Sequence, residues 1–234
     1  MEGPFLDPGI PDGERTVYRA LVEGQELGTG VLVVDHASEN GRELYRQSVA
    51  VRAGGDTEYD LVTTFRRRSG TIHAESYRLE TRHGDSEPVA VEEGRFRQVR
   101  TLQWGGEMQP YPRDLAPLLG SAVALRGLEF EPGFVRSFSV WFANTIFWEF
   151  EAVVEGAEEI ELPVGGMDAW RVRVRPSLEQ VDLALDKIVA GLMPPLVLHF
   201  AKDPPHRFLR FEFPTGPFRD NPQGLIEAIE LDGG

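Results

Sequence analysis

Alternation between apolar and polar positions is the strongest pattern in the chain, and it is clearest between residues 137 and 175. Two alternating runs there are separated by Asn144-Thr145, which predicts a hairpin turn, and a third run follows a Gly-Gly break. The apolar positions of the three runs are Phe138, Val140, Phe142, Ile146, Trp148, Phe150, Ala152, Val154, Trp170, Val172 and Val174. Because successive side chains of a strand point to opposite faces, the pattern predicts antiparallel strands with one apolar and one charged face.

The remainder of the chain predicts further strands, separated by turn signals such as Gly24, Gly41 and Gly70. The expected strands span residues 16–22, 27–35, 44–52, 59–66, 71–81, 88–91, 95–104, 196–201 and 207–213. Residues 1–13 are rich in Pro, Gly and Asp and predict an irregular lead-in. Short loops favour hairpins, so strands that follow one another are expected to pair antiparallel.

Two helices are expected. The first lies within residues 112–128, where Asp114 is a candidate N-cap, although a proline and a glycine inside the segment disfavour a long helix. The second spans residues 177–193, where Ser177 and Gln180 form a capping-box pair and apolar residues follow at helical spacing until a Pro-Pro pair ends it.

These elements predict a mainly β fold. A meander of about ten antiparallel strands tends to curl, because sheets twist and exposed flat edges aggregate. We therefore expect one domain over residues 1–234, built as a closed or half-open lipocalin-like barrel. The amphipathic helix at 177–193 is expected to bury its apolar stripe against the sheet as a plug or lid.

Charge and composition narrow the classes of partner. The 234-residue chain has a net charge of −14 at pH 7, which disfavours nucleic acid and anionic membrane surfaces, since both attract basic patches. It has no cysteine, so disulfides and thiolate chemistry are excluded. No apolar run reaches the ~18 residues of a membrane span, and no signal peptide is visible. The expected location is cytoplasmic, or outside the cytoplasm if a leader has been removed.

The aromatic residues of the central strands are the candidate ligand site. They are Trp141, Phe142, Phe147, Trp148, Phe150 and Trp170, and Leu185, Ile188 and Leu192 of the second helix are expected to cover them. In one interpretation these side chains form a core and nothing more. In the other they line a pocket for a hydrophobic molecule, because a barrel of roughly eight or more strands can retain interior space. Exposed apolar residues on the hairpin also raise the hypothesis of a homo-oligomer.

A polar trio on the strand at 71–81 is the only candidate for acid–base chemistry. His73, Glu75 and Tyr77 alternate and so are expected to share a face. On an inward face they would supply a histidine, a carboxylate and a phenol for proton transfer, and on an outward face they would be ordinary solvated residues. The sequence shows no metal-binding motif, no nucleophile elbow and no nucleotide-binding loop, so no metal or cofactor is expected.

Several short motifs resemble an uncharacterised bacterial family, usually exported, that is known only as a domain of unknown function. They are Pro11 to Arg15 with Tyr18, Gly24 and Gly28; Asp114 to Arg126 with Glu131-Pro132-Gly133; Glu161-Leu162-Pro163, Gly165-Gly166 and Ala169 to Val172; and His206 to Phe211. The resemblance implies a curved sheet or barrel akin to lipocalins and lipoprotein-carrier half-barrels. It implies no activity and no catalytic residues. The missing export signal and the helix at 177–193 depart from the family pattern.

Three functions follow as hypotheses. The first is binding of a lipid-like or polyketide-like molecule against the aromatic residues. The second is a cyclase or isomerase acting in the same cavity, where holding a flexible substrate in a reactive shape lowers the barrier. The third is a structural protein whose interior is filled by its own side chains.

Overall fold

The fold is described by a computed structural model over residues 4–84, 86–96, 101–103, 106–108, 110–143, 146–177, 195–216 and 221–233. The expected helix at 177–193, with Leu185, Ile188 and Leu192, lies outside these residues apart from Ser177, and so does the Asn144-Thr145 turn.

The described part is mainly β, as the alternation predicts. The first strands are β1 (Phe5–Leu6), β2 (Glu14–Val22), β3 (Gln25–Glu39), β4 (Arg42–Ala53), β5 (Thr57–Arg68), β6 (Thr71–His83) and β7 (Ala90–Arg95). A small hairpin, β8 (Thr101–Gln103) and β9 (Gly106–Met108), precedes β10 (Leu115–Pro117), the 3-10 turn η1 (Leu118–Gly120) and helix α1 (Ser121–Leu125). The later strands are β11 (Val135–Ala143), β12 (Ile146–Leu162), β13 (Gly165–Pro176), β14 (Leu196–Ala201), β15 (Phe208–Pro214) and β16 (Gln223–Asp232).

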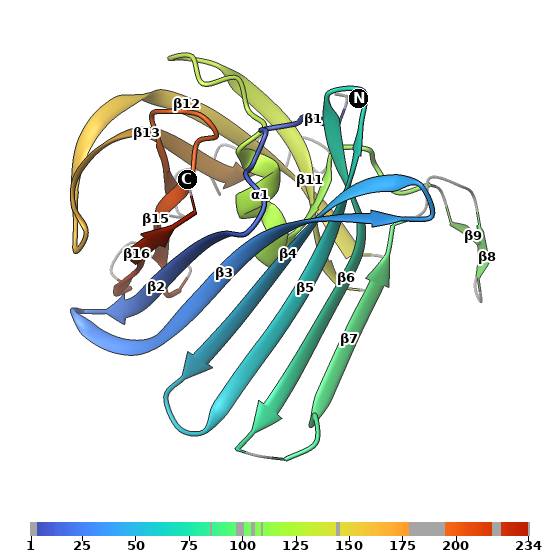
Figure 1. Cartoon of the computed structure of the whole chain (residues 1–234), viewed down its shortest axis with the longest axis horizontal. Helices are drawn as coiled ribbons and strands as arrows, with labels where there is room; N and C mark the ends of the chain where they lie inside the picture. Colours follow the sequence, from blue (N-terminus) through green and yellow to red (C-terminus); the bar gives the residue numbers. More distant parts are fainter. Residues whose placement is uncertain are drawn as a thin grey trace.

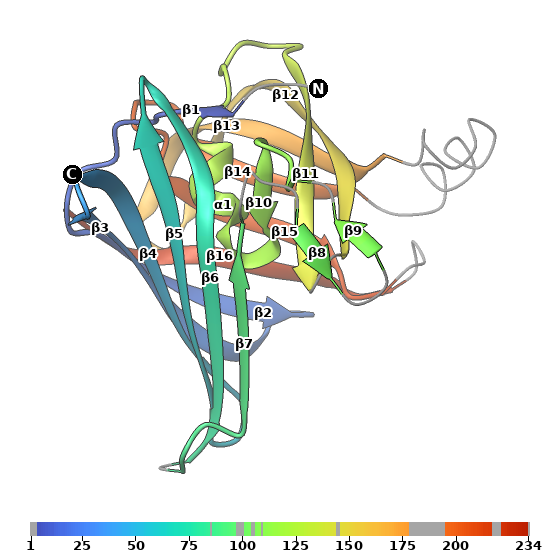
Figure 2. The ribbon, with the colours of Figure 1, turned by 90° about the vertical axis from the view of Figure 1, so that its right-hand side faces the viewer.

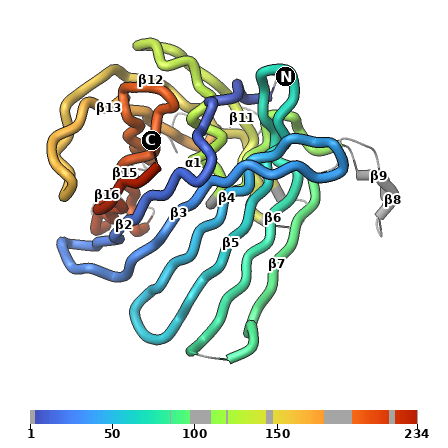
Figure 3. Tube along the Cα trace, in the orientation of Figure 1, coloured from blue at the N-terminus to red at the C-terminus, as the bar shows by residue number. Residues whose placement is uncertain are grey.

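Fourteen of the described strands form one sheet, in the order β1-β6-β5-β4-β3-β2-β16-β15-β14-β13-β12-β11-β10. The fourteenth strand, β7, pairs with β6 along the same edge as β1, further along the strand. Every neighbouring pair is antiparallel except β10 and β11. The last strand, β16, pairs with β2, so the earlier strands (β2–β7) and the later strands (β11–β16) join in the middle of the sheet. Figures 1 and 2 show the sheet curving around α1, and Figure 3 follows the same path along the chain.

The sheet curls like a barrel but does not close in the part of the chain described. Strand β10 lies against β6, yet no hydrogen-bonded ladder joins them. Aromatic packing bridges this seam instead: the rings of Tyr77 on β6 and Trp141 on β11 are 4.9 Å apart between centroids, and those of Phe5 and Phe138 are 5.8 Å apart. The half-open alternative is therefore the correct one, and the closed barrel is wrong for these residues.

The predicted alternation on the central strands is confirmed over most of their length. Phe138, Phe150, Val154, Val172 and Val174 are all buried on one face of the sheet. The pairing of β12 with β13 shifts between Val154 and Gly156, and this β-bulge reverses the alternation. Beyond it, a second small core forms from Ile160, Leu162, Ala169 and Leu209.

The lead-in is more ordered than its composition predicts. Phe5 and Leu6 pair with β6, and both Phe5 and Ile10 are buried. The hydroxyl of Tyr45 accepts from the Ile10 N–H at 3.0 Å and donates to Asp7 at 2.6 Å, so one phenol holds this segment at two points.

The first expected helix is also corrected. Residues 115–117 form a short strand, and the helical part shrinks to η1 and α1. Asp114 is not its cap, because Pro117 and Gly120 occupy the N-cap positions of η1 and α1 without a side-chain cap hydrogen bond. The strands expected at 88–91 and 95–104 are also corrected. The structure has β7 and β8 instead, and β7 runs through residues 92–94, where a break between the two expected strands was predicted.

Candidate ligand-binding cavity

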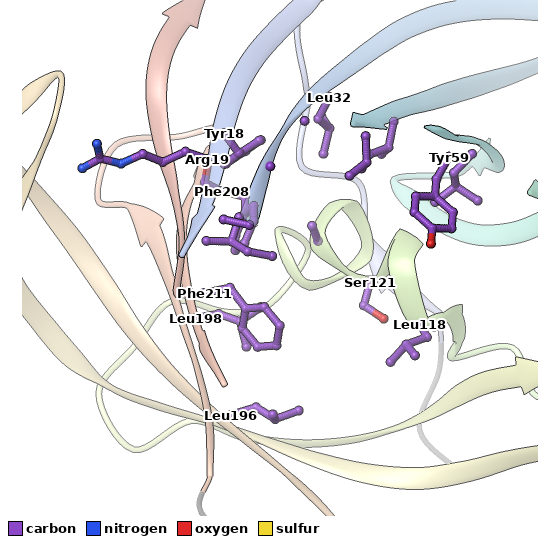
Figure 4. A pocket seen from close by; sticks show the side chains of 18 of the residues that line it. Tyr18, Arg19, Leu32, Tyr59, Leu118, Ser121, Leu196, Leu198, Phe208 and Phe211 are labelled. Atoms are coloured by element: carbon purple, nitrogen blue, oxygen red, sulfur yellow. Dashed lines mark hydrogen bonds between the residues drawn. The ribbon is translucent and has the colours of Figure 1, made fainter. Parts of the chain in front are cut away.

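A cavity of about 430 Å³ lies between the inner face of the curved sheet and the α1 segment. Side chains from both halves of the sheet line it, and Figure 4 shows several of them converging on the open space. From the first strands come Leu32, Val49, Leu61 and Leu79, and from the later strands come Val140, Phe150, Val174, Leu198, Phe211 and Ile226. Ser121, Ala122 and Leu125 of α1 complete the wall.

Two glycines of β3, which have no side chain, leave space along the cavity wall. Gly30 pairs with Tyr18 and with Val51, both of which line the cavity, so a side chain at Gly30 would face the same space. A Cβ added at Gly30 would lie 3.4 Å from Val51 Cγ2, an ordinary contact. A Cβ at Gly28 would lie 2.1 Å from the carbonyl oxygen of Arg52, so that position requires glycine for backbone approach.

Most polar side chains among the lining residues are hydrogen-bonded or ion-paired to other groups, so they present few free polar atoms to the cavity. The guanidinium of Arg19 points away from the cavity (Figure 4) and binds Glu227 at 2.7 Å. Arg52 is highly exposed and pairs with Glu58 at 2.9 Å. The Tyr18 hydroxyl donates to the carbonyl of Phe208 at 2.8 Å, and burial raises the pKa of Tyr18.

Ser121 likewise satisfies its own hydroxyl, which donates to the carbonyl of Pro117 at 2.9 Å. An interior of this kind receives apolar groups with little desolvation cost.

The cavity opens to solvent past three apolar side chains that line it. Leu27 is 52% exposed, Leu118 is 48% exposed and Tyr59 is 36% exposed. Exposed lining residues of this size mark the mouth of a pocket rather than its floor.

Among the predicted aromatic residues, Phe150 is the one that lines the cavity. Trp141 is buried at the seam, between Tyr77 and Phe96, with ring centroids 4.9 and 5.2 Å away. Phe142 packs behind Phe150, with a centroid distance of 6.1 Å.

The other three aromatic residues lie away from the lining. Phe147 is 39% exposed and Trp148 is 58% exposed, and Trp170 packs against Phe130 at a centroid distance of 6.1 Å. The expectation that the exposed Trp148 lies covered inside the sheet is therefore wrong.

The polar trio does not share one face. Thr64 pairs with Ser76 and Phe65 pairs with Ala74, so Glu75 has no partner on β5 and forms a bulge. The bulge reverses the alternation, and His73 and Tyr77 consequently face opposite sides of the sheet.

Each member of the trio also has its own surroundings. Burial, and then the charge of Arg66, lower the pKa of His73. Glu75 binds Arg42 at 2.7 Å, and Tyr77 packs on Trp141. None of the three is among the residues that line the cavity in the described structure.

The described residues contain no group of three or more His, Asp and Glu side chains placed to hold a metal ion. Across the same residues, no helix has the length and apolar character needed to span a bilayer.

The N-terminal half of the cavity wall was missed by sequence reasoning. Leu32, Leu61 and Leu79 alternate along their strands as clearly as the central aromatics do, but only the pairing of β16 with β2 brings the two halves together. Of the two glycines of β3, Gly28 enters the sequence analysis only as part of a family motif, and Gly30 does not enter it.

No protein-family model matches the sequence, and no curated protein matches it. The fold is similar to that of a β-barrel-like protein of the domain of unknown function DUF1849 from Brucella abortus, with a TM-score of 0.54 and 12% identity, covering 95% of this chain and 98% of that one. At this identity the similarity concerns the fold alone, and it confirms the expected likeness to an uncharacterised bacterial protein with a curved sheet.

Two further structures are more distant. One is a protein from Bacteroides fragilis with a YmcC-like fold, described as exported, with a TM-score of 0.41, 10% identity and coverage of 98% and 100% of the two chains. The other, described as a lipoprotein from Parabacteroides distasonis, has a TM-score of 0.35, 10% identity and coverage of 99% and 100%.

Proposed function

We propose that this protein binds a hydrophobic small molecule, lipid-like or polyketide-like, in the cavity between the sheet and α1. The observation that carries the proposal is an apolar space of about 430 Å³ with a mouth formed by Leu27, Tyr59 and Leu118. Small-molecule sites typically have volumes of about 300–1,000 Å³ and mostly apolar linings.

Burial of apolar surface supplies the affinity. Each Å² of apolar ligand surface removed from water contributes roughly 25 cal/mol. Since the Arg19 and Arg52 side chains are engaged elsewhere, orientation depends on shape more than on polar contacts. The lipocalin-like role in this proposal is that of a carrier: the curved sheet shields the ligand, and the mouth admits it.

The alternatives have less support. A filled interior is at odds with the unoccupied volume beside Gly30, where a side chain could have been accommodated. The proton-transfer candidates of the enzyme hypothesis, His73, Glu75 and Tyr77, are not in the cavity lining. No observation favours the cyclase or isomerase hypothesis over binding.

Native mass spectrometry tests the proposal on the protein as purified. The expected spectrum contains a bound species that disappears on extraction with organic solvent, after which the protein takes up the neutral probe N-phenyl-1-naphthylamine with enhanced fluorescence. A protein that carries no ligand and also leaves the probe's fluorescence unchanged after extraction would contradict it.

A further inference from the structure

The inner face of the sheet carries a carboxylate next to the cavity, on β7, one strand beyond the lining residues of β6. Glu92 on β7 pairs directly with Leu79 on β6, and Leu79 lines the cavity. Residues directly opposite on antiparallel strands project to the same side. The exposure of β7 agrees, because Glu92 and Gly94 are half-buried whereas Val91 and Glu93 are exposed.

Aromatic side chains occupy the rows of the ladder on either side of this carboxylate. One pair further along the ladder, Tyr77 faces Gly94, and a Cβ at Gly94 would lie 3.2 Å from the Trp141 ring. Burial, and after it the negative charge of Glu92, raise the pKa of Tyr77 to about 12, so the carboxylate acts on this phenol. In the other direction along β7, Ala90 pairs with Thr81 of β6, and Thr81 pairs with Tyr59 of β5. Tyr59 therefore lies one row from Glu92, towards the mouth.

No cation of the described structure neutralises Glu92, which forms neither a hydrogen bond nor an ion pair with another described residue. The nearby arginines are engaged on the opposite face. Arg78 contacts Glu80 and Glu93, and Arg82 contacts Asp60 and Glu80. Glu93 is thus paired while Glu92, its neighbour, is not.

We propose that the ligand is a cationic amphiphile, a long-chain amine or quaternary ammonium, whose tail fills the cavity and whose charged head lies at Glu92. This inference rests on the function proposed above. A half-buried carboxylate attracts a cation more strongly than a fully solvated one does, because the surrounding protein screens the charge less than water. The ring of Tyr59, which lines the cavity, favours the same charge through cation–π attraction.

The same geometry disfavours an anionic head. A fatty-acid carboxylate or a phosphate would meet Glu92 without a free arginine in the described cavity lining to offset the repulsion, since the two lining arginines, Arg19 and Arg52, pair with Glu227 and Glu58. The net charge of −14 acts in the same direction over longer range. The described residues therefore select against the sign of charge that common fatty acids carry.

Displacement of N-phenyl-1-naphthylamine by three C12 amphiphiles, all below their micelle concentrations, tests the inference. Dodecylammonium, dodecanol and dodecanoate share a tail and differ in head charge. We expect affinity to fall in that order, with roughly tenfold between cation and anion. Glu92→Gln should largely remove this discrimination and leave dodecanol binding unchanged. Glu93→Gln, the same charge change one residue along on the outer face, should keep it.

The outcomes separate the two proposals. If dodecanol and the probe bind but dodecanoate binds as tightly as dodecylammonium, the cationic ligand is wrong and the cavity's binding function stands. If Glu92→Gln and Glu93→Gln reduce discrimination equally, general electrostatics explains it and the assignment to Glu92 is wrong. If neither the probe nor dodecanol binds, the proposed function itself is overturned, and this inference falls with it.

Discussion

The guanidinium of Arg126, directly after α1, donates to both carboxylate oxygens of Glu14 on β2, at 2.6 and 2.9 Å. Both side chains are buried, and Arg126 also donates to the carbonyl of Pro205 at 2.8 Å. This ion pair ties the helix that closes one side of the cavity to the strand that joins the two halves of the sheet.

Breaking this pair is predicted to destabilise the protein severely. Glu14→Gln leaves a buried guanidinium without its countercharge, and the expected loss in the free energy of unfolding is about 3–5 kcal/mol. The double variant Glu14→Leu with Arg126→Met should recover part of that loss, because it removes both charges of the pair but leaves Arg207, 3.5 Å from Glu14, without this partner. Urea denaturation measures both, and a single variant as stable as the wild type would contradict the prediction.

The seam of the half-open barrel is predicted to depend on Trp141. This side chain is 2% exposed and packs on Tyr77, so Trp141→Ala should cost about 3–5 kcal/mol of unfolding free energy through the cavity it leaves. Trp148 is the matched control: it is 58% exposed, and Trp148→Ala should cost under about 1 kcal/mol. Equal losses in urea denaturation would show that the seam is not held by this packing.

The mouth is predicted to control binding without affecting stability. Leu27 on β3 lines the cavity and is 52% exposed, whereas Val91 on β7 is 50% exposed and does not line it. Leu27→Asp should weaken binding of N-phenyl-1-naphthylamine by roughly tenfold, because a charge then borders the apolar entry path. Val91→Asp should leave it unchanged. Equal effects of the two variants would place the probe elsewhere.

Acid stability is predicted to depend on Asp7. Burial opposes its ionisation, yet hydrogen bonds from Tyr45, from the Gly9 N–H and from Arg67 leave the pKa of Asp7 below its usual 3.8. A carboxyl with a lowered folded pKa contributes stability that is complete above the unfolded pKa and is lost as the pH falls through the folded one. The stability gap between wild type and Asp7→Asn should therefore be constant above about pH 5 and shrink below about pH 4.

Unfolding free energies measured across this pH range check the prediction. Asp56→Asn, on an exposed turn, serves as the control for the charge change itself. A wild-type advantage over Asp7→Asn that persists unchanged at the lowest pH would show that the hydrogen bonds matter but the charge does not.

Alternation in the sequence was enough to predict the β class, most strand positions and the inward face of the central strands. Phe138, Val140 and Phe150 are buried as the period of two requires. The period states which face a residue occupies, but it does not state how far along the strand that face stays covered. Trp148 has the parity of Phe150 and is nevertheless exposed, because it lies nearer the strand end.

Bulges explain the other failures. One extra residue reverses the facing of everything that follows. No residue type marks the bulge at Glu75, whereas Gly156 marks the one after Val154, a signal that the sequence analysis did not use. His73 and Tyr77 were separated for this reason. The cavity itself depends on the long-range pairing of β16 with β2 and on the absent side chain of Gly30, which a local pattern cannot reveal.

Binding of N-phenyl-1-naphthylamine to Gly30→Leu tests the central claim most directly. The added side chain projects into the cavity beside Val51, and a strand tolerates leucine better than glycine. We expect at least roughly tenfold weaker probe binding with an unchanged or higher melting temperature, while Val31→Leu, the next residue along β3 and outside the lining, binds as the wild type does. Wild-type probe affinity in a folded Gly30→Leu would contradict the account, because the ligand would then lie elsewhere.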